Sequence, residues 1–182
     1  MIFVTVGSSA PFDRLVRAID QWAGLQGRTD VFAQIGKTRF VPRYIAAVQF
    51  LSPPEFRERI RAAHLVVAHA GMGSIISALE IGKPIIVMPR REYLGESRSD
   101  HQLATAEEFE RRQTIVFARD ESDLIGKLEC EDRLFAKTCI NREASPTLIS
   151  AIRSFILDVE SSNPQPRNES KRRKSMTQYL MG

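Results

Sequence analysis

The sequence predicts one α/β domain, a doubly wound parallel sheet with helices on both faces. Short apolar runs alternate with amphipathic segments along the first 160 residues, as in a sheet built from strand–helix–strand units. Several runs, such as LVVAH and IIVM, are apolar at nearly every position, which is typical of strands buried on both faces. A chain of 182 residues, of which 43% are hydrophobic, is long enough for one core of ordinary size.

The elements follow from local pattern. Strands are expected where short apolar or β-branched runs stop at glycine, proline or polar residues: 1–7, 31–35, 48–51, 64–69, 84–89 and 114–118. Helices are expected where apolar residues recur every three to four positions: from Pro11, from Pro53, then 73–81, 100–112, 122–128 and 145–159. Proline in a first turn supports the first two helices, and Gly82 is a stop signal after the third. Ser145 is the expected N-cap of the last helix.

Charge and composition divide the chain into a domain over 1–160 and a disordered basic tail over 161–182. The net charge of +4 is carried by the tail, so the domain itself is neutral. A neutral domain without a basic face lacks the positive surface charge that is typical of nucleic-acid-binding proteins. The first strand begins at Met1, and no run approaches the roughly 20 apolar residues of a membrane span. The two cysteines lie in no metal-ligand spacing, and a cytoplasmic protein is expected.

A glycine-rich turn, HAGMGS, links the fourth strand to its helix. Glycines at 71 and 73 permit close approach of the backbone to a ligand, and the helix N-terminus attracts anions. Ser74 and His69 could add hydrogen-bond donors, so a diphosphate is the expected ligand. Two alternatives stay open: the glycines serve only a tight turn, and His69 is a core histidine. The turn is not the G-x-G-x-x-G of dinucleotide-binding folds.

A second polar cluster follows the fifth strand and leads into a helix that begins Asp100-His101-Gln102. Because both clusters follow parallel strands, they should face one pocket at the carboxyl edge of the sheet. The alternative for Gln102 is structural, since Ser99 and Gln102 match the capping box S-x-x-Q.

With both clusters identified, the chain resembles the C-terminal, nucleotide-sugar-binding half of family 28 glycosyltransferases of the GT-B fold. Among these, it is most similar to the small catalytic subunits of two-component enzymes, from the dolichol pathway and from bacterial exopolysaccharide assembly. The resemblance covers most of 1–157 and rests on MIFVTVGSSAPFDRLV, HAGMGSI, ALEIGKPIIVMPR and GESRSDHQLATA. It implies a Rossmann-like domain that forms one half of a GT-B cleft.

The resemblance also implies site residues. Those expected at the donor diphosphate and nucleotide are Gly7, Ser8, His69, Gly71, Gly73 and Ser74, and those expected near the donor sugar are Asp100, His101 and Gln102. Many relatives place a ribose-binding glutamate where this chain has Ser77. Glu80 lies on roughly the same helix face and could substitute, or the serine could suffice.

Arginines suggest the donor sugar. Arg90, Arg91 and Arg98 lie in the loop before the Asp100-His101-Gln102 helix, and a guanidinium matches the two oxygens of a carboxylate. Together with the exopolysaccharide resemblance, they favour UDP-glucuronate as donor. The alternative is that they are solvated surface residues.

The implied reaction is inverting transfer from a UDP-sugar, without a cofactor. No Asp-x-Asp occurs in the sequence, so no metal is expected, and the helix N-terminus would stabilise the departing diphosphate. Asp13 is a candidate for the general base, and the alternative role for this carboxylate is to complement the helix dipole.

A partner must supply the other half of the cleft. The resemblance implies a membrane-anchored subunit that binds a polyprenyl-diphosphate-linked acceptor, with this chain held at the inner face of the cytoplasmic membrane. The helix at 145–159 is either the docking helix or part of the core. Two other functions stay open: a non-catalytic nucleotide-sugar-binding module, and a UDP-sugar epimerase, which would need both halves in one chain.

Overall fold

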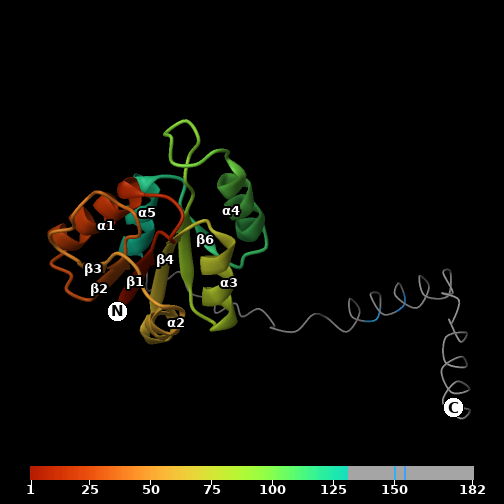
Figure 1. Cartoon of the computed structure of the whole chain (residues 1–182), viewed down its shortest axis with the longest axis horizontal. Helices are drawn as coiled ribbons and strands as arrows, with labels where there is room; N and C mark the ends of the chain where they lie inside the picture. Colours follow the sequence, from red (N-terminus) through yellow and green to blue (C-terminus); the bar gives the residue numbers. More distant parts are fainter. Residues whose placement is uncertain (131–149, 151–153, 155–182) are drawn as a thin grey trace, which may run out of the picture. The chain divides into compact units, whose positions relative to one another are not determined.

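The computed structural model describes residues 1–130 and, beyond them, only Ser150 and Ser154, which are helical. The chain divides into two compact units, 1–141 and 142–182. The described part of the first unit is the coloured domain in Figure 1, and it carries every candidate site residue.

Two predictions fall outside the described residues. They are the helix at 145–159, apart from its two helical serines, and the basic tail at 161–182. The predicted boundary at residue 160 therefore stays a prediction. Among the residues that the structure describes, no helix has the length and apolar character needed to cross a membrane.

Within residues 1–130 the strands form one six-stranded parallel sheet in the order β3-β2-β1-β4-β5-β6. The strands are β1 Ile2–Thr5, β2 Val31–Gln34, β3 Ala46–Val48, β4 Leu65–His69, β5 Ile85–Met88 and β6 Val116–Phe117. The central strands are fully buried or nearly so, as their continuous apolar runs predict.

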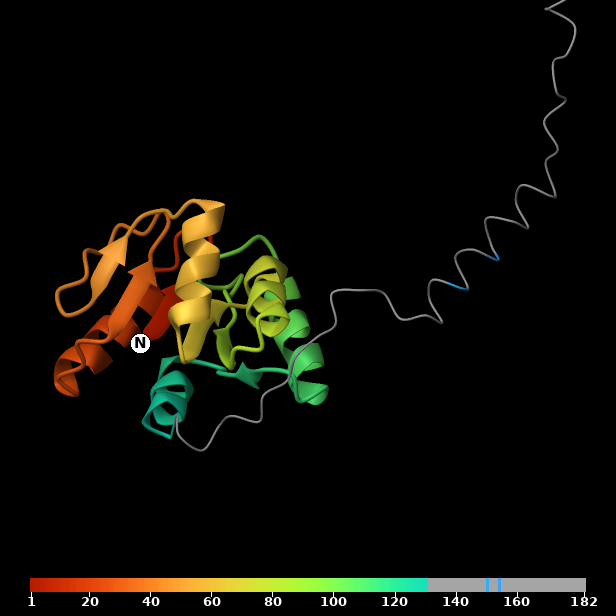
Figure 2. The ribbon, with the colours of Figure 1, turned by 90° about the horizontal axis from the view of Figure 1, so that it is seen from below.

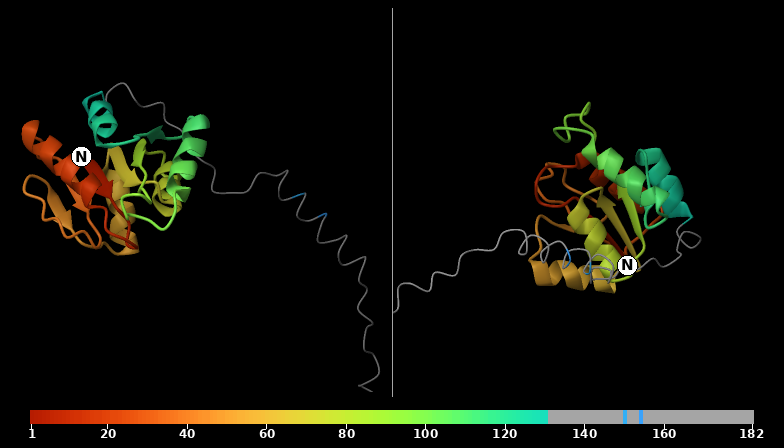
Figure 3. Two further views of the ribbon diagram at one scale, coloured as in Figure 1. Left: turned by 90° about the horizontal axis from the view of Figure 1, so that it is seen from above. Right: turned by 90° about the vertical axis from the view of Figure 1, so that its right-hand side faces the viewer.

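A helix follows each strand except β2, which is followed directly by β3, and the helices cover both faces of the sheet. They are α1 Asp13–Leu25, α2 Pro53–Ala62, α3 Met72–Glu80, α4 His101–Arg111 and α5 Glu121–Glu129. Figures 2 and 3 show α1 and α5 on one side of the sheet and α2, α3 and α4 on the other. The predicted doubly wound α/β fold is confirmed.

The pleat of β1 explains the two layers of core. Ile2 and Val4 point to one face, where they join the buried side chains of α1 and α5 in one hydrophobic cluster. Phe3 points to the other face and joins a second cluster, which includes Ile60 of α2 and Ile75 of α3. The strand is therefore apolar at every position because both of its faces are covered.

The prediction for the third strand is shifted. It was expected at 48–51, but β3 spans Ala46–Val48 and pairs with β2. The cause is a buried carboxylate on α1: Asp20 accepts hydrogen bonds from the backbone N–H groups of residues 43–45 at 2.7–3.2 Å. These bonds fix the chain just before the strand and so help to set where pairing starts.

The sheet changes direction between β1 and β4. From β1 the chain moves outward through β2 and β3, and then returns to place β4 on the other side of β1. In such sheets the loops after the two central strands diverge and leave a crevice at the carboxyl edge. The loop after β1, the HAGMGS turn after β4 and the loop after β5 all lie at this edge.

Candidate functional site

His69, the last residue of β4, is enclosed by two glycines. A Cβ added at Gly7 would lie 2.7 Å from His69 Cε1, and one added at Gly71 would lie 2.1 Å from His69 Nε2. Gly36, after β2, closes the cluster, because its added Cβ would lie 2.5 Å from the Gly7 carbonyl oxygen. The first glycine loop and the HAGMGS turn thus meet around one imidazole ring.

The environment of His69 keeps the imidazole neutral. Burial, and after it the positive charge of Arg90, lower the pKa of His69 to about 4. Its Nδ1 is buried and has no hydrogen-bond partner among the described residues. A backbone hydrogen bond at Thr5 partly opposes this lowering of the pKa. Whether His69 is a core histidine or a donor to the diphosphate stays a prediction.

The N-terminus of α3 is bare. The N-cap Gly71 provides no side-chain bond, and the first turn contains no acidic residue. A Cβ added at Gly73 would meet nothing within 4 Å, so the space beside this first turn is open. Ser74 is buried there. The N–H groups of Met72 and Gly73 donate to no acceptor in the described part of the chain, and with the helix dipole and the open space they make a site for an anion.

The two remaining candidates on α3 lie farther along the helix. The Ser77 hydroxyl donates to the Gly73 carbonyl oxygen at 2.7 Å, one turn away. Glu80 is the last residue of α3, roughly 10 Å along the axis from Gly73 at the usual rise per residue. Ser77 is thus the nearer of the two to the bare first turn.

Arg90 is buried instead of lying on a surface loop. Its side chain is 3% exposed, and its Nη2 donates to the carbonyl oxygens of Val6 and Ala10 at 2.6 and 2.7 Å. Its Nε donates to the Pro11 carbonyl oxygen at 3.4 Å. Because these donors are engaged within the first glycine loop, we assign Arg90 to that loop instead of to the donor sugar.

Gln102 also contacts Arg90, through the Arg90 backbone. It is 8% exposed, and its Oε1 accepts a hydrogen bond from the Arg90 backbone N–H at 3.1 Å. The capping-box alternative is wrong: the N-cap of α4 is Asp100, and the Ser99 hydroxyl contacts His101 Nδ1 at 2.8 Å. Arg90 and Gln102 both belong to the second polar cluster, and the link from this cluster to the HAGMGS turn is the charge of Arg90, which lowers the pKa of His69.

Asp100, His101 and Arg91 are more peripheral. Asp100 and His101 are exposed, and Asp100 Oδ1 accepts from the Glu92 backbone N–H at 2.9 Å. The Arg91 guanidinium donates to the Arg119 carbonyl oxygen at 3.0 Å. Ser8 is exposed on the first glycine loop. Their predicted contacts with a donor stay predictions.

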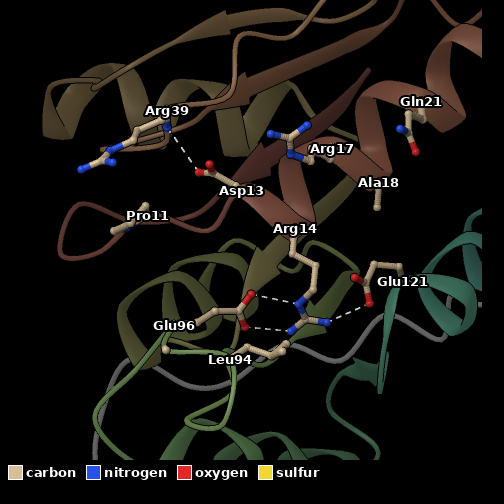
Figure 4. A pocket seen from close by; sticks show the side chains of 11 residues that line it. Pro11, Asp13, Arg14, Arg17, Ala18, Gln21, Arg39, Leu94, Glu96 and Glu121 are labelled. Atoms are coloured by element: carbon tan, nitrogen blue, oxygen red, sulfur yellow. Dashed lines mark hydrogen bonds and ion pairs between the residues drawn. The ribbon is translucent and has the colours of Figure 1, made fainter.

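A cavity of about 790 Å³ lies beside the start of α1 (Figure 4). Asp13 lines it and accepts from the Arg39 backbone N–H at 3.3 Å. Asp13 lies in the first turn of α1, the position that complements the helix dipole. Its role as a base stays a prediction.

The same cavity contains an ion-pair network that sequence reasoning missed. Arg14 donates through Nε and Nη2 to the two carboxylate oxygens of Glu96, both at 2.9 Å, and through Nη1 to Glu121 at 2.9 Å. Burial alone would lower the pKa of Arg14, but these two carboxylates raise it above its ordinary value. The network ties α1 to the loop before α4 and to α5. In the sequence, Glu96 lies in the segment GESRSDHQLATA, and nothing there indicates its pairing with Arg14.

No group of three or more His, Cys, Asp and Glu side chains within residues 1–130 could hold a metal ion. The predicted lack of a metal requirement is a statement about the reaction, and it stays a prediction.

Comparison with known proteins identifies the family of this sequence. A family model described as the glycosyltransferase family 28 C-terminal domain matches residues 1–131. The UDP-N-acetylglucosamine transferase subunit ALG13 of Homo sapiens is 31% identical over 126 residues, which cover 64% of this chain and 11% of that protein. The ALG13 protein of Yarrowia lipolytica is 26% identical over 138 residues, which cover 69% and 68% of the two chains.

The fold comparison agrees. An NMR solution structure of ALG13 superimposes with a TM-score of 0.54 at 19% identity, covering 83% of this chain and 93% of that one. This likeness confirms the predicted Rossmann-like fold of a GT-B C-terminal half. The chain spans only a small part of the human relative, so that protein's full activity is not carried over. Because the family model covers well over half of the sequence, the chain belongs to the glycosyltransferase family 28 C-terminal-domain family.

Proposed function

We propose that this chain is the donor-binding, catalytic subunit of a two-component UDP-sugar transferase. The observation that carries the proposal is the bare first turn of α3 at the switch point of the sheet, in a chain of family 28. Open space at Gly73 and a first turn without an acidic residue match what a diphosphate needs: close approach, N–H donors and no competing carboxylate.

The names of the relatives support a partner. Both ALG13 proteins are named as subunits, and a single sheet provides one wall of the cleft that a complete GT-B enzyme closes between two domains. We therefore infer a membrane-anchored glycosyltransferase subunit that binds the acceptor, a polyprenyl-diphosphate-linked saccharide. The complex would work at the inner face of the cytoplasmic membrane.

The donor sugar is the finer part of the proposal. The relatives are named for UDP-N-acetylglucosamine, which supports that donor. UDP-glucuronate, the donor for exopolysaccharide synthesis that the loop arginines favoured, now rests on Arg91 and Arg98, because the Arg90 guanidinium is bonded to backbone carbonyls. A direct comparison of the two donors decides between them.

The chemistry assigned to the site is inverting transfer. An acceptor hydroxyl attacks the anomeric carbon, the bond from that carbon to the diphosphate oxygen breaks, and UDP leaves. The hydroxyl proton passes to a general base, for which Asp13 is the candidate in this chain. Negative charge grows on the diphosphate, and N–H donors of the α3 first turn would stabilise it, each contributing about 3 kcal/mol.

The test is co-expression of the full chain with a membrane-anchored glycosyltransferase subunit, sought first among the adjacent genes, in the presence of a polyprenyl-linked acceptor. We expect metal-free transfer from a UDP-sugar that needs both chains, and UDP binding by this chain alone. Transfer by this chain without a partner would contradict the two-component proposal. Donor binding without transfer in the complete mixture would instead identify a non-catalytic nucleotide-sugar-binding module.

A further inference from the structure

Arg90 connects the end of β5 to a loop about 80 residues earlier in the chain. Its Nη2 donates to the Val6 and Ala10 carbonyl oxygens at 2.6 and 2.7 Å, and its Nε to the Pro11 carbonyl oxygen at 3.4 Å. One planar guanidinium thereby reaches both ends of the loop. A fork with fixed donor directions holds such an arrangement better than a single ammonium does.

The loop keeps its amide groups available. The N–H groups of Ser8, Ser9 and Ala10 donate to no other residue within the described part of the chain. Ser8 and Ser9 are exposed. With the carbonyls at both ends of the loop bound by Arg90, these amides are free to bind an anion at the carboxyl edge of the sheet.

The charge of Arg90 is not neutralised locally. Within residues 1–130, no carboxylate oxygen lies within 4 Å of its guanidinium, whereas that of Arg14 has two carboxylate partners. Instead, Arg90 contacts three carbonyls, and its guanidinium carbon lies 5.2 Å from the Phe12 ring centroid. Burial lowers the pKa of Arg90 below its ordinary value, and the charge of Glu96, which is already paired with Arg14, opposes this only in part. A buried, unneutralised cation favours an anionic ligand nearby.

The backbone of Arg90 is held by a hydrogen bond to α4. Its backbone N–H donates to Gln102 Oε1 at 3.1 Å, which links it to the first turn of α4. Its charge is close enough to His69 to lower the pKa of that ring. Arg90 therefore lies among all three loops that border the bare N-terminus of α3.

We propose that Arg90 is a positioning residue of the donor site, whose guanidinium holds the loop of residues 6–11 so that its amides and the α3 first turn bind one diphosphate. The inference rests on the proposed function, and it adds a buried cation that holds the first glycine loop in the site. Arg90 acts through the loop and through its charge, without a direct contact to the donor sugar.

Calorimetric titration of the full chain with UDP and UMP tests this role in Arg90→Lys and Arg90→Met. Lysine keeps the charge but has one nitrogen in place of the fork. We expect both variants to lose at least about tenfold in UDP affinity and less in UMP affinity, because UMP has no second phosphate. Arg61→Met, at the far end of α2 from the carboxyl edge of the sheet, is the control and should bind UDP normally.

Two readouts separate positioning from general damage. Hydrogen exchange of residues 1–12 should accelerate in both variants while exchange in the other strands is unchanged, and UDP should slow it in the wild-type chain. The NMR titration of His69 should shift to higher pH in Arg90→Met but not in Arg90→Lys, because only methionine removes the charge.

The outcomes distinguish the positioning role of Arg90 from the proposed function of the chain. Normal UDP affinity and normal loop exchange in Arg90→Lys would overturn the positioning role and leave the proposed function intact. If Arg90→Met does not fold, Arg90→Lys and the exchange of the wild-type loop carry the test. Failure of the folded wild-type chain to bind UDP would overturn the proposed function, and this inference with it.

Discussion

Substituting Gly73 separates ligand binding from folding. A Cβ at this position meets nothing within 4 Å, and Gly73 is not among the glycines with positive φ, so an L-residue fits the backbone. It lies in the first turn of α3, where alanine is a better helix former than glycine by up to about 1 kcal/mol. We therefore expect Gly73→Ala to leave the free energy of unfolding unchanged or raise it by this amount.

UDP affinity should move in the opposite direction. The open space beside Gly73 is where a phosphate would approach the N–H groups of the turn, and a methyl group there would hinder it. A hydrogen bond to a charged group is worth about 1.5–3 kcal/mol, so loss of one such bond lowers affinity roughly tenfold to a hundredfold. Gly73→Val should have the larger effect, because it fills more of the approach.

The assay is calorimetric titration with UDP, together with urea unfolding of each variant. Gly126→Ala is a matched control, because this glycine lies in α5 with equally open space around its Cβ position. The control should be stabilised without a change in UDP affinity. If Gly73→Val binds UDP as tightly as the wild type does, the α3 turn does not hold the diphosphate and the reasoning fails.

Three further predictions concern the surroundings of the site. Gln102→Leu should lower the free energy of unfolding by about 1–3 kcal/mol, because it leaves the buried N–H of Arg90 without an acceptor, whereas Gln102→Glu keeps the acceptor; equal losses in urea unfolding would refute this. His69 has a pKa of about 4 in the folded chain against about 6.5 when unfolded, so the unfolded state binds more protons between these values and stability rises with pH there. His69→Gln should flatten that rise by at most about 3 kcal/mol, measured as urea midpoints at pH 4.5 and 7.5. Glu96→Ala should cost about 2–3 kcal/mol by removing two charge-assisted bonds from Arg14, and Glu96→Gln should cost less because one acceptor remains; a similar cost for both would contradict the bidentate pairing.

The fold and the place of the site could be predicted because both depend on local signals. Strands buried on two faces must be apolar at every position, and helices that cover a sheet must have an apolar stripe. The two patterns differ, so the order of strands and helices can be predicted from the sequence. Once the order of elements is known, the carboxyl edge of a parallel sheet is the expected ligand edge. The meeting of the first glycine loop and the HAGMGS turn at His69 follows from that rule.

Contacts between distant residues could not be predicted. Arg90 was expected to bind the donor sugar, with a solvated surface position as the alternative, whereas its burial depends on carbonyls 79–84 positions away. The Arg14 network likewise joins residues 82 and 107 positions apart. No periodicity or motif identifies which carbonyl or carboxylate such a side chain will reach, because that depends on how the loops pack.

The two glycines of HAGMGS have different surroundings, so substitutions at the two positions test different things. An added Cβ at Gly71 would collide with His69 Nε2, whereas one at Gly73 would project into open space. A Gly71 variant that lost UDP binding would therefore report displacement of the imidazole as much as loss of phosphate approach. The same holds for Gly7, whose φ of +72° adds backbone strain to its contact with the ring. Of the three glycines, only Gly73 lets a loss of affinity be assigned to the ligand, because the fold does not require a glycine there.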